Sequence, residues 1–281
     1  MKVGFVVLTY NRPDAALAVL RGLALQCPAD AVVVVADDGS RPENVQALRS
    51  GMPAFACPVR HVWHPDEGFT AARARNLGAR AAQADYLVFL DGDCVPAPGF
   101  VAHHLRLAEA GCFVNGSRVL LGEGLSGRVV RGEVQLPALR PRDWLRLRLA
   151  GEVNKLTHLL YWPARMGRVE SRFRWKGIRS CNFGVWYGDF EAVNGFDESF
   201  KGWGHEDADL VLRLHQWGCR RKNGFMATEV FHLWHPENSR GEEAGNRDRV
   251  LQRMQGKITR AQLGLAEAGL RDNAVVTELN R

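Results

Sequence analysis

Two aspartates separated by one glycine follow the apolar run YLVFL, and their carboxylates are the first candidates for chemistry in this chain. In an extended segment the side chains of Asp91 and Asp93 point to the same side, and Gly92 lets the backbone turn so that both face one ligand. A divalent cation relieves their repulsion, and oxygen ligands without paired thiolates suit Mn²⁺ or Mg²⁺. With so few protein ligands, phosphate oxygens of a substrate would complete the shell. A polar strand end or an Asx turn is the alternative explanation.

A second segment whose residues could take part in a reaction is FDESFKGWGHEDADLVLRLHQWG, residues 196–218. Three acids begin a predicted helix in it. These are Glu206, Asp207 and Asp209, and they follow a Gly-Trp-Gly sequence centred on Trp203. Acids in a first helical turn often only complement the helix dipole, but that explanation does not account for the glycines. A carboxylate here can act as a general base, although we expect the dipole to lower its pKa and weaken it in that role. The glycines predict a loop that closes over a ligand and excludes water.

Two other segments can complete such a site. TEVFHLWHPENS contains a strand-like run from Glu229 to Trp234 that can return to the aspartates, so we predict His232 as a third metal ligand and His235 as the reserve. A purely structural histidine is the ordinary alternative. DEGFTAARARNLGARA places Arg73 and Arg75 in the first turns of a helix, where phosphate oxygens bind. Surface ion pairing is the alternative for either arginine.

A regular alternation of apolar runs and helix-like stretches must position these residues. The predicted strands are Val3–Leu8, Ala31–Ala36, Val59–Trp63 and Tyr86–Leu90. The predicted helices between them are Ala15–Leu25, Pro42–Ser50 and Thr70–Gln83. The strands end every 27 or 28 residues, which is the length of a βα unit and predicts an α/β fold whose parallel sheet is covered on both faces. Ligands of such sheets bind beyond the carboxyl ends of the strands.

Later elements are less regular. An apolar stripe predicts a helix from Arg142 to Trp162, and a second stripe predicts a helix that contains Leu251, Met254, Ile258, Ala261 and Leu265. The sequence GEGLSG, residues 122–127, fits the glycine pattern of dinucleotide-binding turns. It lies outside the first βα turn and leads into RVVRGEV, which we do not expect to be helical, so its context excludes that function.

Composition and charge restrict the class of protein. The chain has 281 residues, 46% of them hydrophobic, and its six cysteines form no CxxC pair, which predicts reduced thiols in a cytoplasmic protein. No apolar run approaches the roughly 20 residues that span a bilayer, so we expect neither export nor a membrane-spanning segment. The net charge is +6, with an excess of arginine between residues 124 and 176. This excess favours an anionic partner, or a peripheral contact of the helix from Arg142 with an anionic membrane; a solvated surface is the alternative.

Taken in order, TYNRP, DDGS, EGFTAARARNLG, FLDGDC and FKGWGHEDADL resemble the GT-A fold glycosyltransferases of family 2. The last segment is similar to the galactosyltransferase-type C-terminal half of β-1,4-galactosyltransferases and chondroitin polymerases. The resemblance covers about residues 3–117 and 180–240. It implies a Rossmann-like, mostly parallel sheet flanked by helices, with a helical acceptor-side region. Residues 1–118 would bind the nucleotide sugar, residues 119–245 would form the acceptor-binding and catalytic half, and residues 246–281 would be a helical extension.

The resemblance also implies roles for individual residues. Those that would contact the nucleotide are Thr9, Asn11 and Arg12 beside the base, Asp38 on the uracil, and Arg75 near the diphosphate or donor sugar. Asp91 would touch the ribose or the metal-bound donor, and Asp93 would bind the metal directly. Asp207 would be the catalytic base, Glu206 would orient the acceptor, and Trp203 would cover the donor.

The implied activity is metal-dependent, inverting transfer of a sugar from a UDP-sugar (Gal, GalNAc, Glc or GlcNAc) to a glycan or glycolipid acceptor, which gives a β-linkage. The implied setting is bacterial surface polysaccharide or lipopolysaccharide synthesis, at the inner face of the membrane if the contact is peripheral, with no nucleic acid partner. A sugar nucleotidyltransferase and a catalytically silent glycan-binding module are the alternatives. His205 stands where the relatives usually have a second glycine, which brings loop flexibility and substrate choice into question.

Overall fold

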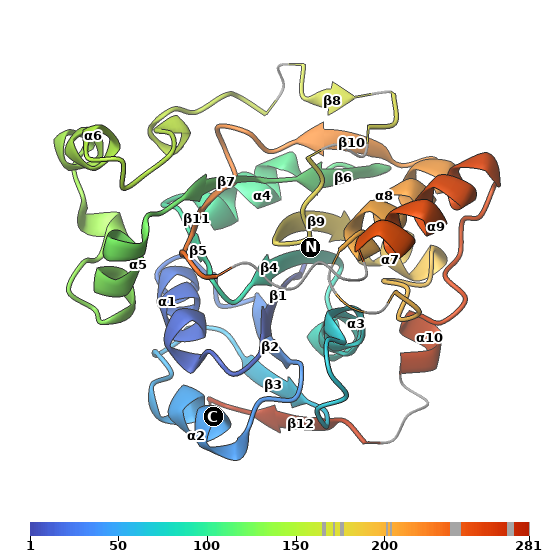
Figure 1. Ribbon diagram of the computed structural model, residues 1–281, viewed down its shortest axis with the longest axis horizontal. Helices are drawn as coiled ribbons and strands as arrows, with labels where there is room; N and C mark the ends of the chain where they lie inside the picture. Colours follow the sequence, from blue (N-terminus) through green and yellow to red (C-terminus); the bar gives the residue numbers. More distant parts are fainter. Residues whose placement is uncertain are drawn as a thin grey trace.

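A nine-stranded sheet with helices on both faces forms the centre of the molecule (Figure 1). The computed structural model describes residues 1–164, 167–170, 172–174, 177–200, 202, 204–236, 243–268 and 273–280. The strand order in the large sheet is β12-β3-β2-β1-β4-β9-β6-β10-β8, and a small sheet has the order β5-β11-β7. The predicted α/β architecture with a mostly parallel sheet is confirmed.

The first four strands run parallel and end at one edge of the sheet. They are β1 (Val3–Thr9), β2 (Val32–Asp37), β3 (Val59–Trp63) and β4 (Tyr86–Asp91), and the intervening helices are α1 (Pro13–Ala24), α2 (Pro42–Ser50) and α3 (Ala71–Ala82). Side chains of α1 pack with Phe5 and Val7 on one face, whereas those of α3 pack with Val6 on the other. Helix α3 lies so close to the sheet that a Cβ at Gly78 would be 2.6 Å from Val6. These elements match the sequence prediction to within a few residues.

The remaining strands of the large sheet come from distant parts of the chain. They are β6 (Cys112–Asn115), β8 (Val169–Glu170), β9 (Asn182–Trp186), β10 (Arg220–Asn223) and β12 (Val275–Glu278). Strand β9 runs antiparallel between β4 and β6, and β12 pairs antiparallel with β3 at the edge. The predicted helical extension over residues 246–281 is therefore wrong in part, because its final strand completes the sheet. The helices α4 (Phe100–Leu107) and α7 (Tyr187–Ala192) adjoin these strands.

The small sheet brings the second half of the chain to the aspartates. Strand β11 (Glu229–His232) lies between β5 (Cys94–Pro96) and β7 (Ser117–Leu120), antiparallel to β5 and parallel to β7. The register sets His232 opposite Cys94, the residue that follows Asp93. The predicted return of this segment to the aspartates is confirmed, although the strand ends at His232 rather than at Trp234.

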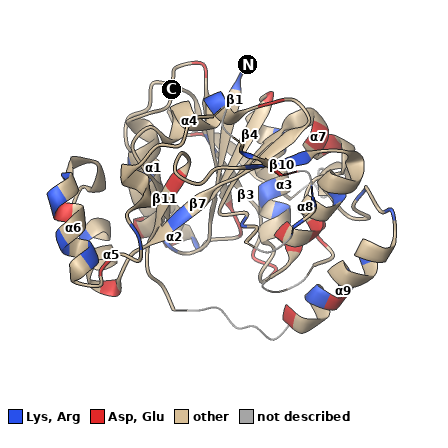
Figure 2. Ribbon diagram, turned by 90° about the horizontal axis from the view of Figure 1, so that it is seen from above, with Lys and Arg blue, Asp and Glu red and all other residues tan. Residues whose placement is uncertain are grey.

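The long helix predicted from Arg142 to Trp162 is wrong. Helix α6 (Pro141–Leu149) ends before Gly151, which has a φ of +76°, and the chain continues through the 3-10 turn η2 (Thr157–Leu159). Trp144 anchors α6 by stacking on Phe231 with ring centroids 4.7 Å apart. Leu149, on the outward face, is instead 80% exposed and lies between arginines. Figure 2 shows the basic residues along α6 in blue. The predicted apolar stripe is thus only partly a packing surface.

Two other helices also differ from the prediction. The sequence GEGLSG does lead into a helix, α5 (Glu123–Val130), whose Leu125 N–H donates to Glu152 Oε2 at 3.0 Å. A short turn, η1 (Leu136–Ala138), follows it. Helix α9 (Glu243–Gln255) ends before Ile258, and Leu265 belongs to a separate helix, α10 (Leu265–Ala268). Among the described residues no helix is both long and apolar enough to cross a membrane, and the six cysteines are buried free thiols.

Helix α9 is bound to helix α8 (Glu206–Trp217) by buried charges. Asp209 Oδ1 accepts from Arg253 at 2.6 Å and Oδ2 accepts from Arg213 at 2.8 Å, while Arg253 also donates to Asp197 at 2.8 Å. Both carboxylates are inaccessible to solvent. The network fixes the helix that begins with the acids at residues 206 and 207.

Arg253→Met is expected to lower the free energy of unfolding by about 1–3 kcal/mol, because it leaves the buried Asp197 carboxylate without its ionic partner. Chemical denaturation of the variant measures this loss. Arg247→Met is the matched control, because Arg247 is exposed on the same helix. Equal losses in the two variants would contradict a stabilising role for the network.

Candidate active site

The loops after β1 and β2 are tied together at the carboxyl edge of the sheet. Asn11 has a φ of +50°, its N–H donates to Ser40 Oγ at 2.8 Å, and its Oδ1 accepts from Asn44 at 2.9 Å. Thr9 is buried beside these hydrogen bonds, whereas the side chain of Arg12 is 41% exposed. All three residues expected beside the nucleotide base therefore lie on this edge, and Asn11 also fixes the loops.

Asp38 is buried at the same edge and holds the start of α3. Its two carboxylate oxygens accept hydrogen bonds from Thr70 Oγ1 at 2.5 Å and from Thr70 N–H at 3.0 Å. His64 Nε2 lies 3.3 Å from Asp38 Oδ1. Tyr10 stands next to this group with 47% of its surface exposed, and its hydroxyl donates to Asp66 at 2.9 Å. The edge thus offers an exposed aromatic ring beside a fixed carboxylate.

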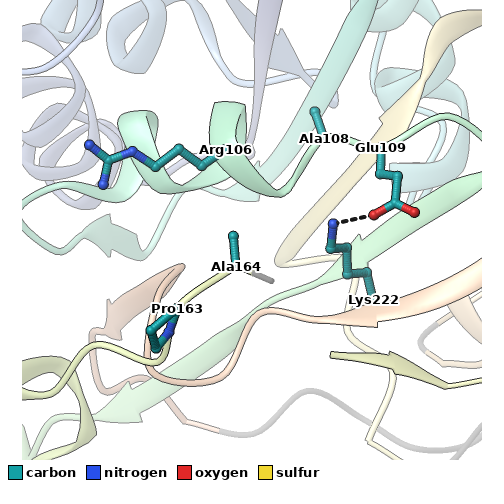
Figure 3. A pocket seen from close by; sticks show the side chains of 6 residues that line it. All are labelled: Arg106, Ala108, Glu109, Pro163, Ala164 and Lys222. Atoms are coloured by element: carbon teal, nitrogen blue, oxygen red, sulfur yellow. Dashed lines mark hydrogen bonds and ion pairs between the residues drawn. The ribbon is translucent and has the colours of Figure 1, made fainter. Parts of the chain in front are cut away.

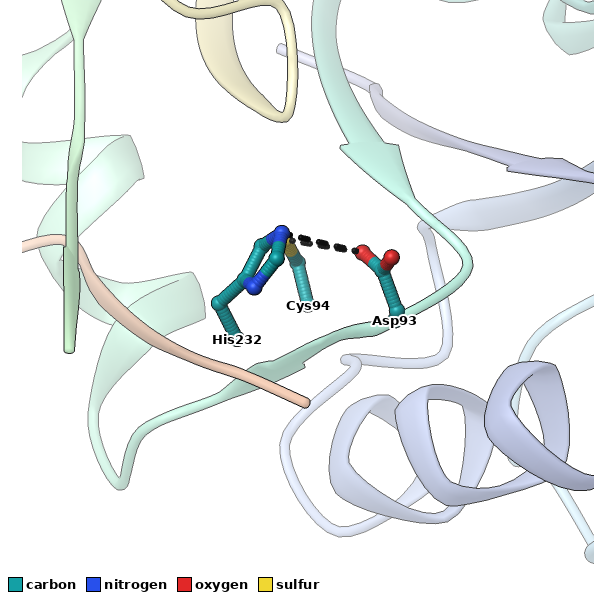
Figure 4. Close-up of side chains that lie close together, drawn as sticks. All are labelled: Asp93, Cys94 and His232. Carbon is teal, nitrogen blue, oxygen red and sulfur yellow. Dashed lines mark hydrogen bonds and ion pairs between the residues drawn. The ribbon is translucent and has the colours of Figure 1, made fainter. Parts of the chain in front are cut away.

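A cluster of candidate metal ligands lies where β4 leads into β5. The ligand atoms of Asp93, Cys94 and His232 all lie within 4.8 Å of one another (Figure 4). His232 Nε2 is 3.8 Å from Asp93 Oδ1, and His235 Nε2 is 3.2 Å from Asp93 Oδ2. The structure therefore brings both predicted histidines to Asp93. Asp91 is not part of this cluster and contacts an arginine instead.

The donor chemistry of this cluster suits a divalent cation. The cluster offers the Asp93 carboxylate, the imidazoles of His232 and His235 and the Cys94 thiol. Burial, and next the neighbouring Cys181 thiol, raise the pKa of Cys94, whose Sγ–H donates to Asp93 at 3.4 Å. Mg²⁺ prefers oxygen ligands alone, whereas an imidazole also suits Mn²⁺.

The glycine between the two aspartates is required by packing. A Cβ at Gly92 would lie 2.6 Å from the carbonyl oxygen of Leu8, so only glycine lets this turn pass so close to β1. The sequence predicted a glycine here because it lets the chain turn freely. The structure instead gives the close approach of two backbone segments as the reason. Because that approach fixes the turn, it also fixes where Asp91 and Asp93 leave the sheet.

Arg75 joins the end of β4 to the start of α8. The side chain is buried, one guanidinium nitrogen lies 2.8 Å from Asp91 Oδ1, and the other lies 3.2 Å from Glu206 Oε1. Burial lowers the pKa of Arg75, but the charges of Asp91 and Glu206 outweigh it and raise the pKa above its usual value. The arginine therefore remains charged and connects the aspartates after β4 with the acids of α8.

Asp207 has the environment of a general base. Its Oδ1 accepts from the Ala208 N–H at 2.7 Å and its Oδ2 accepts from the Ser180 N–H at 3.3 Å. Burial, and next the charge of Glu206, raise the pKa of Asp207 to about 7. The expectation that the helix dipole would lower this pKa is wrong, because burial and a like charge outweigh the dipole.

The loop before α8 is only partly described. Trp203, predicted to cover the donor, lies outside the described residues, while Gly202 and Gly204 on either side have φ values of +70° and +105°. His205 has a φ of +70°, a conformation that glycine adopts with less strain. The glycine that the resemblance to family 2 implies at this position would fit that backbone better.

A separate hollow lies away from this site. It has a volume of about 550 Å³ and is lined by Arg106, Ala108, Glu109, Pro163, Ala164 and Lys222 (Figure 3). Lys222 and Glu109 form an ion pair of 2.6 Å across it. None of the predicted site residues lines this hollow, so it carries no argument about the chemistry.

The sequence prediction missed three residues beside the site. Cys94 lies in the metal-ligand cluster, and Arg118 and Arg179 approach it from β7 and from the turn before β9. Cys94 directly follows the aspartates in FLDGDC, which was an available signal. Nothing in the sequence alone places β7 beside β11, so Arg118 could not have been found in that way.

Sequence comparison finds relatives for most of the chain. Residues 5–172 match the profile of glycosyl transferase family 2, and residues 164–236 match the N-terminal domain of galactosyltransferase. Validoxylamine A glucosyltransferase of Streptomyces hygroscopicus subsp. limoneus is 33% identical over 76% of this chain and 48% of its own length. Chondroitin synthase of Escherichia coli is 27% identical over 91% of this chain and 38% of its own. The chain thus spans about half the length, or less, of these relatives.

Solved structures show the same fold at low identity. TarS of S. aureus in complex with UDP-GlcNAc has a TM-score of 0.60 at 13% identity, covering 95% of this chain and 69% of that one. The mannosyltransferase PcManGT from Pyrobaculum calidifontis in complex with GDP-Man and Mn²⁺ has a TM-score of 0.53 at 19% identity, covering 89% and 61%. The second of these is a mannosyltransferase, and the two likenesses together with the family 2 profile confirm the predicted GT-A fold. Since the family 2 profile matches more than half of the chain, the protein belongs to glycosyl transferase family 2.

Proposed function

We propose that this protein is an inverting, metal-dependent glycosyltransferase that moves a sugar from a UDP-sugar to a glycan or glycolipid acceptor. One observation carries the proposal: a chain of contacts links the metal-ligand cluster to a carboxylate with the pKa of a base. Asp93 belongs to the cluster, Asp91 leaves the same turn, and Arg75 joins Asp91 to Glu206, which is followed by Asp207. The likeness to family 2 supports the same reaction class.

Each part of this arrangement has a place in the reaction. Asp93 and His232, with His235 in reserve, would hold Mn²⁺, which supplies positive charge to the departing diphosphate. Thr9, Asn11, Arg12 and Asp38 would border the nucleoside at the carboxyl edge. Arg75 orients Asp91 and Glu206, and its charge lies near the diphosphate and donor sugar.

Asp207 would remove the proton from the acceptor hydroxyl. With a pKa of about 7 it is both substantially ionised and basic near neutral pH, which suits a general base. Glu206 would orient the acceptor while remaining paired with Arg75. Attack on the face opposite the departing nucleotide inverts the anomeric centre, so an α-linked donor gives a β-glycoside.

Two different donor classes are compatible with the fold. The TarS and GalNAc-T7 structures contain UDP or a UDP-sugar, whereas PcManGT contains GDP-Man. The sequence resemblance favours a UDP-sugar of Gal, GalNAc, Glc or GlcNAc. A bacterial surface polysaccharide or lipopolysaccharide is the proposed product, and the outward face of α6, with Leu145 and Leu149 between arginines, supports a peripheral contact with an anionic membrane.

A panel of nucleotide sugars tested by thermal unfolding examines the proposal. UDP and UDP-sugars are expected to raise the Tm in the presence of Mn²⁺, because ligand at about 100 times Kd stabilises the folded state by about 2.7 kcal/mol. The shift should disappear when EDTA removes the metal. A larger shift with a nucleoside triphosphate, together with release of pyrophosphate from it, would favour a nucleotidyltransferase. Binding without transfer to any glycan would favour a silent module.

A further inference from the structure

Two half-buried arginines stand beside the site without an ion-pair partner among the described residues. Arg118 lies opposite Val230 in the pairing of β7 with β11, so it projects from the same sheet face as His232. Arg179 precedes Ser180, whose N–H donates to Asp207. Within the described ranges neither guanidinium forms an ion pair or a side-chain hydrogen bond. The two arginines therefore border the space between the metal-ligand cluster and the base.

The electrostatics of the neighbourhood agree with this placement. Burial lowers the pKa of Arg179 and the positive charge of Arg118 lowers it further, while Asp207 and Cys94 oppose the shift. Two like charges held together in a partly buried place are unfavourable unless a negative group joins them.

A third cation nearby is already neutralised. Lys155 Nζ donates to Ser117 Oγ at 2.5 Å and lies 3.4 Å from Glu229 Oε2. Glu229 is buried and also accepts from Thr157 at 2.9 Å. This lysine belongs to the fixed structure. Arg118 and Arg179, in contrast, are not directly paired with an acid in the part of the chain that the structure describes.

We propose that Arg118 and Arg179 bind the carboxylate or phosphate of an anionic acceptor sugar. The inference rests on the proposed function and names the acceptor class of that same site. Arg179 adjoins the residue that bonds Asp207, so a group bound there lies next to the hydroxyl that Asp207 deprotonates. Guanidinium groups pair with carboxylate and phosphate oxygens through two parallel hydrogen bonds. Both arginines lie outside the basic stretch of residues 124–176 that first indicated an anionic partner.

Three methyl hexosides that differ only at C6 can test the proposal. The first has a free C6 hydroxyl, the second has a carboxylate at C6, and the third has a phosphate ester on the C6 hydroxyl. Their Kd values are measured by NMR titration of the protein with bound UDP and Mn²⁺. The wild type is expected to bind the two charged sugars at least about tenfold more tightly than the neutral one. Arg118→Gln and Arg179→Gln should each lower the ratio of the neutral-sugar Kd to the charged-sugar Kd by about tenfold. The corresponding lysine variants should retain part of this preference.

The control removes the same charge elsewhere. Arg21 and Arg49 lie in the last turns of α1 and α2, which end at the edge of the sheet opposite the site. Arg21→Gln with Arg49→Gln should leave all three Kd values unchanged. No preference for the charged sugars in the wild type would overturn the inference while leaving the proposed function intact. A tenfold weaker Kd for UDP in the arginine variants would overturn it too, by assigning them to the donor. Failure of the wild type to bind UDP with Mn²⁺ would instead refute the proposed function.

Discussion

Asp207→Asn is expected to lower kcat by a factor of about 10²–10⁴, because the amide cannot accept the proton of the acceptor hydroxyl. The Kd for UDP in the presence of Mn²⁺ should stay within about twofold of the wild-type value, since the cluster around Asp93 is intact. Steady-state kinetics and calorimetry measure the two quantities. Full turnover by this variant would refute the assignment of the base.

The neighbouring acid provides the control for this substitution. Glu206→Gln keeps Asp207 but removes the charge that pairs with Arg75 and helps to raise the pKa of Asp207. We expect it to shift the pH profile of kcat/KM toward lower pH and to raise the KM for the acceptor. Asp207→Asn should lower kcat at every pH, so the two variants distinguish the base from its neighbour.

The pKa of about 7 also predicts how pH acts on activity and on stability. Activity should rise as pH passes through about 7, where Asp207 loses its proton. Stability should change in the opposite sense, because a carboxyl whose pKa is raised by folding holds more protons in the folded than in the unfolded chain between its unfolded pKa of about 4 and 7. The free energy of unfolding therefore falls as pH rises through that window. Asp207→Asn should accordingly raise the Tm more at about pH 8 than at about pH 5.

Asp93→Ala is expected to weaken Mn²⁺-dependent UDP binding by more than about 100-fold and to reduce transfer below detection. It removes the carboxylate that His232 and His235 both approach, at 3.8 Å and 3.2 Å. Calorimetric titration of UDP with and without Mn²⁺ measures the loss. Retained metal dependence in this variant would show that the metal binds elsewhere.

Cys94→Ser is the matched control for the cluster. The serine hydroxyl replaces a buried thiol that donates to Asp93, and it can make the same contact. We assign the metal to the carboxylate and the imidazoles of the cluster, so we expect the Kd for UDP with Mn²⁺ to change by less than about threefold. A loss as large as that of Asp93→Ala would identify Cys94 as a metal ligand and would contradict the choice of Mn²⁺.

The first half of the fold was predictable because its signal is local. Strands β1, β2 and β4 are almost entirely buried and therefore read as largely apolar runs, whereas β3 (VRHVW) also contains Arg60 and His61. A helix follows each of the first three strands at a regular spacing. Helix α6 was mispredicted because Leu145 and Leu149 have the spacing of a packed face but are 51% and 80% exposed. Periodicity reports an apolar stripe without reporting whether another element covers it.

The same distinction between local and long-range signals applies to the site. The aspartates after β4 and the acids of α8 were found because their types and spacing are unusual within a few residues. The contact of Arg75 with both groups joins residues 131 positions apart, and the pKa of Asp207 depends on burial. Such effects arise only when distant segments meet. The sequence indicated the candidate reacting groups, and the folded chain shows that one buried arginine contacts both Asp91 and Glu206.

A crystal structure with Mn²⁺ and UDP, with the metal located by its anomalous scattering, tests the central claim most directly. We expect one metal peak within about 2–2.5 Å of Asp93 and His232, with the diphosphate on its far side and the Asp207 carboxylate facing the space beyond the β-phosphate. A metal peak away from Asp93, or a nucleotide bound with Asp207 turned from that space, would contradict it.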